Sequence, residues 1–558
     1  MSDRMSRRRF LGTAAAAGAA GVAAAHAATG AEAGPAPPAE QRSPFASNLV
    51  VNDDGHVFPY INDDLKPDDL RRYLQSYCRS GVGAVAYCVG DMTWPTLYPT
   101  QVGVHYSTMR DGADLKRARF YRNAEKFESE PGGYFGTAFR IIHELGKKVL
   151  ASFRMNDAHF TSLQDPNVSE FWKQHAKLSL GSAYGYYGGS LNYASEVVRS
   201  HFKARVLEFV ALYPEIDGVD LDAMRSPFFF PPDKGKENAP LLTGMVREIK
   251  AALRDEAKRR NRPEYLLTTN VPLTPELALE CGLDTVAWDA EGLFDCISVG
   301  TYQGYMNHPM EQWKEALKKG TPVYAYLNCS VQTGQYLGLE AYRAAAANAF
   351  GSGADGVYLF NYPCLFELAS QMPCRREDAG IELPDMRSVG QPDLTKVGQA
   401  LEELGSPEIL RHKDKRFLFN FSNDTRYRHY APELASIDRG REAESLEAVF
   451  RCYEDYDRAK EMTLAFKVEN VARGETFAIT LNGRPVEPPD EAITYAANGR
   501  DTRIHTVKLG PYLRYDVSLK PGQLEKGQNT LVVKPARLIA DLAGKINLVE
   551  IELAVRYG

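Results

Sequence analysis

The sequence predicts an α/β protein in which a closed barrel of eight parallel strands, a (β/α)8 TIM barrel, is followed by an all-β sandwich. Three observations lead to this prediction. Short apolar runs alternate with helical stretches between about residues 48 and 365. Strands that alternate with helices form a parallel sheet, and about eight such units fit a barrel with insertions. From about residue 441 onward the chain shows strand patterns alone.

Each expected barrel strand is a short apolar run, and the runs are 48–51, 82–89, 148–155, 218–222, 266–270, 296–300, 323–327 and 356–360. The stretches between them carry apolar residues at helical spacing, which predicts helices at 67–80, 136–145, 197–212, 243–260, 310–318 and 339–351. An open doubly wound sheet is the alternative architecture. It loses its best support because no G-x-G-x-x-G motif follows the first strand.

The last part of the chain, residues 441–558, reads as a jelly-roll-like β-sandwich. Residues 462–468 alternate between polar and apolar, and 477–481 run into the tight-turn signal Asn482-Gly483. Residues 366–440 are rich in charge and proline, and we expect them to form a connecting region packed on the barrel. The sandwich either binds glycan or only packs against the barrel, and the sequence leaves both open.

The N-terminus has the three parts of an export signal in order. Arg7-Arg8-Arg9 is followed by an Ala/Gly-rich run from residue 12 to 25, and Ala25-His26-Ala27 is a small-x-small cleavage site. We expect residues 1–27 to be a twin-arginine signal peptide and 28–47 a flexible spacer. The mature protein would then be periplasmic or extracellular.

Composition excludes several classes of partner and cofactor. The net charge of -6 gives no electrostatic basis for binding nucleic acid or an anionic membrane. None of the 8 cysteines is in C-x-x-C spacing, so we expect no zinc site, and nothing in the sequence demands another metal or a cofactor. The 30 Tyr and 25 Phe suit a sugar-binding cleft, although β-rich cores use aromatics as well. The oligomeric state stays open.

The strongest chemical motif is the fourth expected strand with the turn that follows it. Alternate residues of a strand share a face, so Asp220 and Asp222 should both point into the barrel. Buried carboxylates are costly unless they are paired or used, and crowding would raise the pKa of at least one of them. Arg225 is the expected partner. A purely structural Asp–Arg network is the alternative interpretation.

The third expected strand adds a second group of polar residues. Arg154 and Asn156 share its inward face, and Asp157 and His159 begin the loop at the mouth of the barrel. A forked guanidinium suits sugar hydroxyls or a carboxylate. We expect Asp157 to be the second catalytic carboxylate. A metal site formed by Asp157, His159 and Asp222 is conceivable, but the spacing does not demand it.

Further polar or aromatic side chains follow most of the other strands, where barrel enzymes build their sites. Together with Arg154, Asn156, His159 and Arg225, we expect these residues to bind substrate: Asp54, Asp91, Trp94, Tyr193, Asn270, Tyr302, Asn328 and Asn361. By contrast, Asp289, Glu291 and Asp295 precede the sixth strand. They should lie at the opposite face, so we do not expect them to be catalytic.

The barrel part of the sequence resembles a known group of proteins. Residues 191–194, 197–199 and 217–225, with 270–272, 282–288 and 291–295, are similar to the glycosyl-hydrolase-like, family-10-like TIM-barrel glycosidases over about residues 48–365. More distantly, residues 218–223 are similar to the fourth-strand motif of the alpha-amylase superfamily, whose final Asp is the nucleophile. That role would fall on Asp222. The chain departs from the amylase pattern at Asp220, where that pattern has Arg, and at Asn270, where a Glu would be expected nearby.

The resemblance implies a glycoside hydrolase, and with the export signal we expect a secreted enzyme that acts on a poly- or oligosaccharide. Asp222 would be nucleophile or base, and Asp157 or Asp220 the acid. The alternative is a catalytically silent glycan-binding barrel, which the missing fifth-strand Glu favours. A metal-dependent hydrolase or lyase is a third possibility. The sugar, the linkage and the stereochemical outcome are not indicated.

Overall fold

The computed structural model describes residues 43–55, 66–108, 121–158, 161–165, 168–182, 188–301, 308–328, 338–363, 394–420, 435–439, 444–500, 508–540 and 542–558. The expected signal peptide and most of the spacer lie outside these residues. Among the described helices, each is too short or too polar to span a bilayer.

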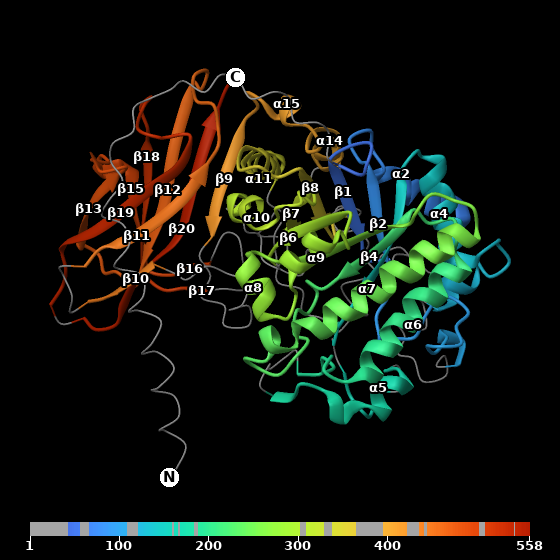
Figure 1. Ribbon diagram of the computed structural model, residues 1–558. Coiled ribbons are helices and arrows are strands. Elements are labelled where there is room, and N and C mark those ends of the chain that lie inside the picture. The colour runs from blue at the N-terminus through green and yellow to red at the C-terminus, as the bar shows by residue number, and fades with distance from the viewer. Residues whose placement is uncertain are drawn as a thin grey trace, which may run out of the picture. The chain divides into compact units, whose positions relative to one another are not determined.

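A closed barrel of parallel strands forms the first part of the described chain, as predicted (Figure 1). The strands follow one another round the barrel in chain order, and β1 closes it by pairing with β8. They are β1 (Leu49–Asp53), β2 (Ala84–Gly90), β3 (Lys148–Arg154), β4 (Gly218–Asp222), β5 (Leu266–Pro272), β6 (Cys296–Gly300), β7 (Val323–Asn328) and β8 (Gly356–Phe360).

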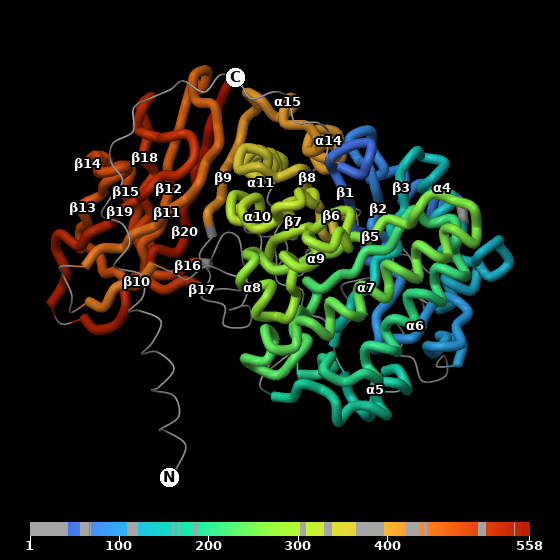
Figure 2. Tube along the Cα trace, in the orientation of Figure 1, coloured from blue at the N-terminus to red at the C-terminus, as the bar shows by residue number. Residues whose placement is uncertain are grey.

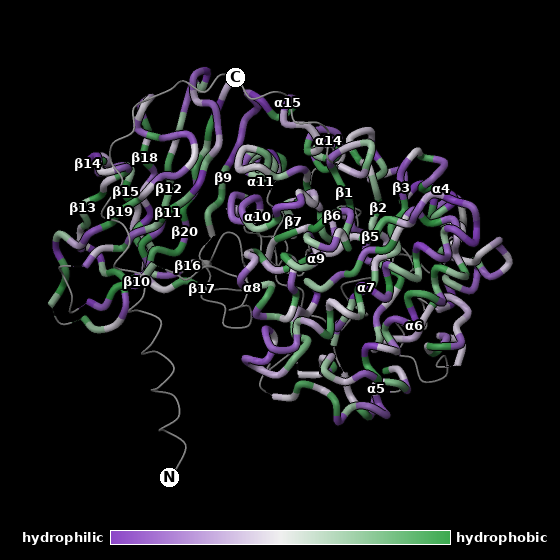
Figure 3. Tube along the Cα trace, in the orientation of Figure 1, coloured by the Kyte–Doolittle hydropathy of each residue, from purple (hydrophilic) through white to green (hydrophobic). Residues whose placement is uncertain are grey.

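Helices connect the barrel strands. They include α2 (Pro67–Tyr77), α4 (Gly133–Glu144), α5 (Glu170–Gln174), α6 (Glu196–Leu212), α7 (Gly235–Arg259), α8 (Pro275–Glu280), α9 (Thr285–Glu291), α10 (Met310–Ala316) and α11 (Leu339–Gly351). Helix α7 changes between hydrophobic and hydrophilic residues along its length (Figure 3). It buries one apolar face, which contains Leu242, Val246, Ile249 and Leu253.

Every second residue of a barrel strand points into the barrel. These inward side chains change from apolar to polar along the strands. The apolar layer includes Val50, Ala84, Leu150, Cys296 and Tyr324. Toward the carboxyl ends of the strands the inward residues become polar. The register pairs Ser152, Asp220 and Thr268 on adjacent strands, and two residues further on it pairs Arg154, Asp222 and Asn270. The mouth of the barrel is therefore built from two successive polar layers.

Two antiparallel sheets follow the barrel, traced in orange and red in Figure 2. One sheet contains β9 (Lys415–Asn420), β10 (Ala435–Asp438), β12 (Glu461–Glu469), β15 (Ile493–Ala496), β18 (Tyr512–Ser518) and β20 (Lys545–Arg556). The other contains β11 (Leu446–Cys452), β13 (Thr476–Leu481), β14 (Arg484–Val486) and β19 (Gly527–Arg537). A short ribbon joins β16 (Gly499–Arg500) to β17 (Lys508–Leu509). The two sheets share one apolar core, so they form a sandwich.

The sandwich begins earlier in the chain than residue 441. Strands β9 and β10 fall within the expected connecting region, and both pair with β20. Helices α14 (Leu394–Glu403) and α15 (Pro407–Leu410) also lie in that region, and α14 contacts α11 and α2. Strands β9 and β10 are short and interrupted by polar residues, which is why the sequence alone reads as a connection.

Side chains of helix α11 contact the strand β11 and the turn after it. Asn348 Nδ2 donates to the carbonyl of Arg451 at 2.6 Å, and the amide of Tyr453 donates back to Asn348 Oδ1 at 2.9 Å. At the surface, Arg556 pairs with Glu340 at 2.6 Å.

Candidate active site

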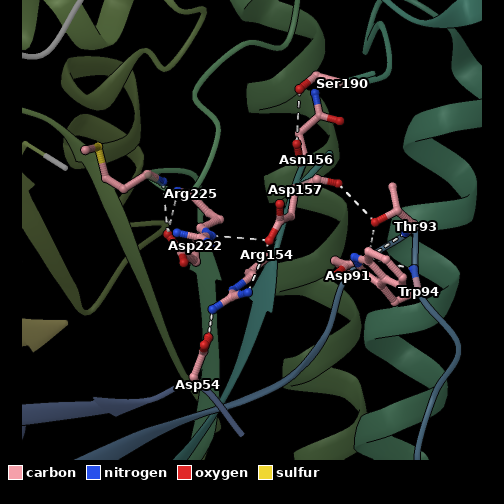
Figure 4. Close-up of polar contacts among 11 residues, drawn as sticks. Asp54, Asp91, Thr93, Trp94, Arg154, Asn156, Asp157, Ser190, Asp222 and Arg225 are labelled. Carbon is pink, nitrogen blue, oxygen red and sulfur yellow. Dashed lines mark hydrogen bonds and ion pairs between the residues drawn. The ribbon is translucent and has the colours of Figure 1, made fainter. Parts of the chain in front are cut away.

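A chain of ion pairs crosses the carboxyl ends of β1, β3 and β4 (Figure 4). The Arg154 guanidinium contacts the Asp54 carboxylate. Nη1 of Arg154 lies 3.1 Å from Oδ2 of Asp157, and Nε of Arg225 lies 3.3 Å from the same oxygen. Arg154, Asp157 and Arg225 are all buried. The structure therefore brings the predicted Asp54, Arg154, Asp157, Asp222 and Arg225 to one place.

Asp222 ends β4 at this place and is held by its own turn. Its Oδ1 accepts hydrogen bonds from the backbone amides of Met224 at 3.0 Å and Arg225 at 3.3 Å. An aspartate that accepts from amides two and three residues ahead fixes a tight turn. The side chain is buried, at 1% exposure. No donor among the described residues contacts its second oxygen, Oδ2, which is therefore available to a ligand.

The environment of Asp222 favours its protonated form. Burial and then the negative charge of Asp220 raise its pKa from 3.8 to about 6, although Arg154 and Arg225 act in the opposite direction. A carboxyl group with a pKa near 6 can hold a proton in mildly acidic solution and release it again, which is what general acid catalysis requires.

Asp220 lies one layer deeper than Asp222 and is fully occupied. It accepts from Thr268 Oγ1 at 2.7 Å, Ser152 Oγ at 2.8 Å, Tyr358 OH at 3.1 Å and Asn270 Nδ2 at 3.2 Å. Burial raises its pKa, and these hydrogen bonds partly offset the effect. The alternation of the strand places Asp220 and Asp222 on one face, as predicted. Because four donors occupy its oxygens, Asp220 stabilises the layer beneath the mouth of the barrel. Its negative charge raises the pKa of Asp222.

Asp91 also has a raised pKa, and its contacts point to a role in shaping the loop. Burial and then the charge of Asp157 raise the pKa of Asp91 to about 6. Its Oδ1 accepts from the amide of Thr93 at 2.5 Å, from Thr93 Oγ1 at 2.7 Å and from the amide of Trp94 at 2.9 Å. Thr93 Oγ1 also donates to the Asp157 carbonyl at 3.2 Å. Asp91 thus fixes the turn that carries Thr93 and Trp94, and Thr93 joins this turn to the backbone of Asp157 (Figure 4).

Asn156 and Tyr193, which we expected to bind substrate, hold the neighbouring loops together instead. Asn156 Nδ2 donates to the carbonyls of Phe228 at 2.5 Å and Leu191 at 2.9 Å, and its Oδ1 accepts from the Leu191 amide at 2.8 Å. The buried Tyr193 hydroxyl donates to the Met155 carbonyl. Because both side chains are engaged with backbone groups, they position the loops after β3 and β4.

The remaining predicted residues have different outcomes. Asn270 lies inside the barrel on β5, and Asn361 follows β8 with a left-handed φ of 53°, its amide donating to Asn52 Oδ1 at 3.3 Å. Asn328 is the last residue of β7. His159 and Tyr302 lie outside the described residues.

The prediction missed two tyrosines at the mouth. Tyr326 on β7 and Tyr358 on β8 are register partners whose rings stack with centroids 5.5 Å apart and 12° between their planes. Their sequence signal was the alternation within the expected strands 323–327 and 356–360, which puts both residues on the inward face. In a run that also reads as apolar core, an aromatic residue gives no signal that separates a site residue from a core residue.

The acidic residues before β6 lie away from the mouth, as expected. Asp289 accepts from the backbone amides of Lys319 at 2.7 Å and Thr321 at 3.0 Å, and Asp295 pairs with Lys250 at 2.6 Å. No group of His, Cys, Asp and Glu within the described ranges could hold a metal ion.

No protein-family model matches the chain, and no curated protein does either. Solved structures with similar folds include the alpha-L-fucosidase isoenzyme 2 from Paenibacillus thiaminolyticus, with 13% identity over 68% of this chain and 51% of that one and a TM-score of 0.39. The chain thus spans about half of that fucosidase. A GH18 chitinase from Pseudoalteromonas aurantia shares 13% identity over 57% of this chain and 96% of that one, with a TM-score of 0.32.

A third similar structure is the chitinase-like agglutinin RobpsCRA from Robinia pseudoacacia, with 12% identity over 50% of this chain and 88% of that one and a TM-score of 0.31. Similarities at this level concern the fold and leave open what this chain binds. The resemblance to family-10-like barrels stays a prediction.

Proposed function

We propose that this protein hydrolyses glycosidic bonds in a poly- or oligosaccharide, with Asp222 as the general acid and Asp157 as its partner carboxylate. The observation that carries the proposal is the state of Asp222 at the mouth of the barrel. Its pKa is raised to about 6, Oδ1 is fixed by two backbone amides, and no described donor contacts Oδ2. This assignment exchanges the roles that the sequence suggested, since Asp222 now carries the proton.

The proposed reaction follows from the different surroundings of the two carboxyl groups. The Oδ2 proton of Asp222 passes to the glycosidic oxygen as the bond to the anomeric carbon breaks. Asp157 stabilises the positive charge that develops on the sugar ring, and two guanidinium groups hold it in place. Water supplies the hydroxyl group that ends on the anomeric carbon, and its remaining proton restores the acid. Both carboxyl groups contact Arg225: Asp222 accepts from its backbone amide, and Asp157 accepts from its Nε. The two groups are therefore near enough to each other to act on the same glycosidic bond.

A second candidate function is glycan binding without turnover. One observation favours it: Oδ2 of Asp157 is already bonded to both Arg154 and Arg225, which weakens that oxygen as a base or nucleophile. The experiment that tests hydrolysis separates the two candidates.

The test is turnover of a panel of 4-nitrophenyl glycosides and of cell-wall and algal polysaccharides. Wild type is compared with Asp222→Asn and with Asp233→Asn, a matched exchange at an exposed position of the same β4–α7 connection where a left-handed φ of 63° accommodates Asn. We expect Asp222→Asn to lose activity by about 10²–10⁴-fold, the usual range for general acid catalysis, and Asp233→Asn to retain it.

Two results would oppose hydrolysis. Equal turnover by Asp222→Asn and wild type would remove Asp222 from the reaction. Glycan binding by both proteins with no turnover of any substrate would support the silent barrel.

We also propose that residues 1–27 direct export by the twin-arginine route to the periplasm or the cell exterior, where polysaccharide substrates occur. The ordered basic, apolar and small-x-small segments support this. N-terminal sequencing of protein recovered outside the cytoplasm should begin at Ala28, and Arg7→Lys with Arg8→Lys should block its release. An unprocessed protein confined to the cytoplasm would oppose export.

A further inference from the structure

Several buried polar atoms around Asp222 have no hydrogen-bond partner in the part of the chain that the structure describes. Two of them, the Tyr326 hydroxyl and Asn270 Oδ1, belong to neutral side chains, and Arg154 Nε is another. Tyr326 is 1% exposed and Asn270 is fully buried. A polar group buried without a partner costs free energy, so such groups are rare in native proteins unless a ligand completes them.

Both side chains are linked to the layer that contains Asp222: Asn270 belongs to it, and Tyr326 stacks on Tyr358, whose hydroxyl accepts from Asn270 Nδ2 at 3.1 Å. Asn270 is the register partner of Asp222 on the adjacent strand β5. Burial and then the negative charge of Asp222 raise the pKa of the Tyr326 hydroxyl, which reflects its proximity to that carboxyl group. The hydroxyl is therefore neutral and able both to donate and to accept.

Neighbouring groups fix the orientation of these two side chains. Nδ2 of Asn270 donates to Asp220 Oδ2 at 3.2 Å and to Tyr358 OH at 3.1 Å, so Oδ1 must be the atom that lacks a partner. The Tyr326 ring stacks on Tyr358 and, with centroids 5.2 Å apart, on Phe360. An acceptor and a neutral hydroxyl are thus held in place before any ligand binds.

The charges around these atoms favour a neutral ligand. Two cations, Arg154 and Arg225, pair with Asp54 and Asp157, although Arg154 Nε makes no hydrogen bond to a described residue. Asp222 and the buried Asp220 add two further acidic groups. A ligand carboxylate or sulfate would therefore meet more carboxyl groups than cations among the described residues.

On the basis of the proposed function, we propose that Tyr326 OH, Asn270 Oδ1 and Asp222 Oδ2 form a subsite for the hydroxyl groups of a neutral sugar ring. A sugar hydroxyl donates to Asn270 Oδ1, and a neighbouring one exchanges a hydrogen bond with Tyr326. The subsite excludes hexuronic acids and sulfated sugars, which makes Tyr326 and Asn270 determinants of specificity.

The test measures sugar binding and turnover on the full chain. Isothermal titration calorimetry uses glucose, galactose, mannose, xylose, fucose, glucuronic acid and galacturonic acid, and turnover uses the 4-nitrophenyl glycosides of the same sugars. We expect at least one neutral sugar to bind and neither hexuronic acid to do so. Tyr326→Phe should weaken binding of that sugar about tenfold, the effect of one lost hydrogen bond of about 1.4 kcal/mol.

Thermal unfolding separates a ligand contact from a structural one. Tyr326→Phe should not lower Tm, because the hydroxyl that it removes is buried and makes no hydrogen bond to a described residue. Tyr358→Phe should lower Tm, because its hydroxyl bonds to Asp220 and Asn270. Tyr495→Phe, the same exchange on strand β15 of the sandwich, should alter neither binding nor turnover.

The possible outcomes distinguish failure of this subsite from failure of the proposed hydrolysis. Turnover that Tyr326→Phe leaves intact overturns the subsite alone. Binding of a neutral sugar that depends on Tyr326 without any turnover supports the subsite and opposes hydrolysis. Preferential binding of a hexuronic acid, or no binding of any neutral sugar, overturns the subsite.

Discussion

The buried Asp222 carboxyl group lowers the free energy of unfolding at neutral pH. The environment of this group can therefore be measured through the stability of the protein. Its folded pKa is about 6, above the ordinary value of 3.8, so the native state binds the proton more tightly than the unfolded chain does. Stability is then greatest below the unfolded pKa and declines as the pH rises toward the folded one. A destabilising buried carboxyl group is typical of a site kept for function.

Asp222→Asn should therefore raise the free energy of unfolding, and more at high pH than at low pH. The two pKa values imply a gain that is about 2 kcal/mol larger at pH 7.5 than at pH 4.5. Denaturant unfolding at both pH values measures this difference. The exposed Asp233→Asn should show no such pH dependence, and an equal effect of Asp222→Asn at both pH values would contradict the raised pKa.

At the residue scale the sequence predicted which side chains meet but not what each one does. The two-residue period of a strand puts Asp220 and Asp222 on one face. It does not reveal that Ser152, Thr268 and Tyr358 converge on Asp220, because these contacts join residues 68, 48 and 138 positions away. Depth within the barrel likewise depends on the register of several strands, which no single strand pattern encodes.

At the element scale, β4 depends on a close approach to β5. A Cβ placed on Gly218 would lie 2.4 Å from the carbonyl oxygen of Leu266, a backbone atom that cannot rotate away. The glycine that begins Gly-Val-Asp-Leu-Asp therefore sets the spacing of the two strands that carry Asp222 and Asn270. The sequence predicted β4 with its observed bounds, but not the reason for this glycine.

Gly218→Ala should destabilise the protein by about 1–3 kcal/mol, the usual cost of overpacking, and should lower any turnover by displacing Asp222. Gly244→Ala is the control: it lies within helix α7 with no neighbour within 4 Å of the added methyl group, and it should stabilise by up to about 1 kcal/mol. Thermal unfolding of both variants checks this. A Gly218→Ala protein as stable as wild type would show that β4 and β5 can separate at no cost.

Helix α7 shows the limit of local patterns. Its apolar spacing predicted a start near residue 243, yet the helix begins at Gly235 and includes Pro240. Proline lacks the amide that an interior helical position donates, so it reads as a helix boundary. Here it is the sixth residue of the helix, which continues past it although the hydrogen bond to the carbonyl four residues earlier is missing.

At the scale of the whole molecule, the barrel and the sandwich are linked by partly buried hydrogen bonds. Asn348 on α11 both donates to and accepts from the backbone at residues 451 and 453. The order of the expected strands and helices predicted both the barrel and the sandwich, because hydrophobic periodicity and turn signals can be read from short segments of the sequence. The start of the sandwich at β9 could not be predicted, because that strand is defined by pairing with β20 more than a hundred residues later.

Asn348→Leu should lower the free energy of unfolding by about 1–3 kcal/mol, because it leaves the partly buried backbone groups of Arg451 and Tyr453 without these hydrogen bonds. Arg556→Ala removes the exposed ion pair with Glu340 and should cost less than about 1 kcal/mol. Differential scanning calorimetry should show a broadened or divided transition for Asn348→Leu alone. Identical transitions for the two variants would mean that these hydrogen bonds do not couple the barrel to the sandwich.

The most direct test of the central claim, that Asp222 supplies the proton for glycoside hydrolysis, is the pH dependence of kcat/KM on the best glycoside substrate. We predict that kcat/KM falls as the pH rises through about 6, and that Asp220→Asn moves this fall to lower pH by removing the charge that helps to raise the pKa of Asp222. A profile that stays flat or rises through pH 6, or one that Asp220→Asn leaves in place, would contradict the claim.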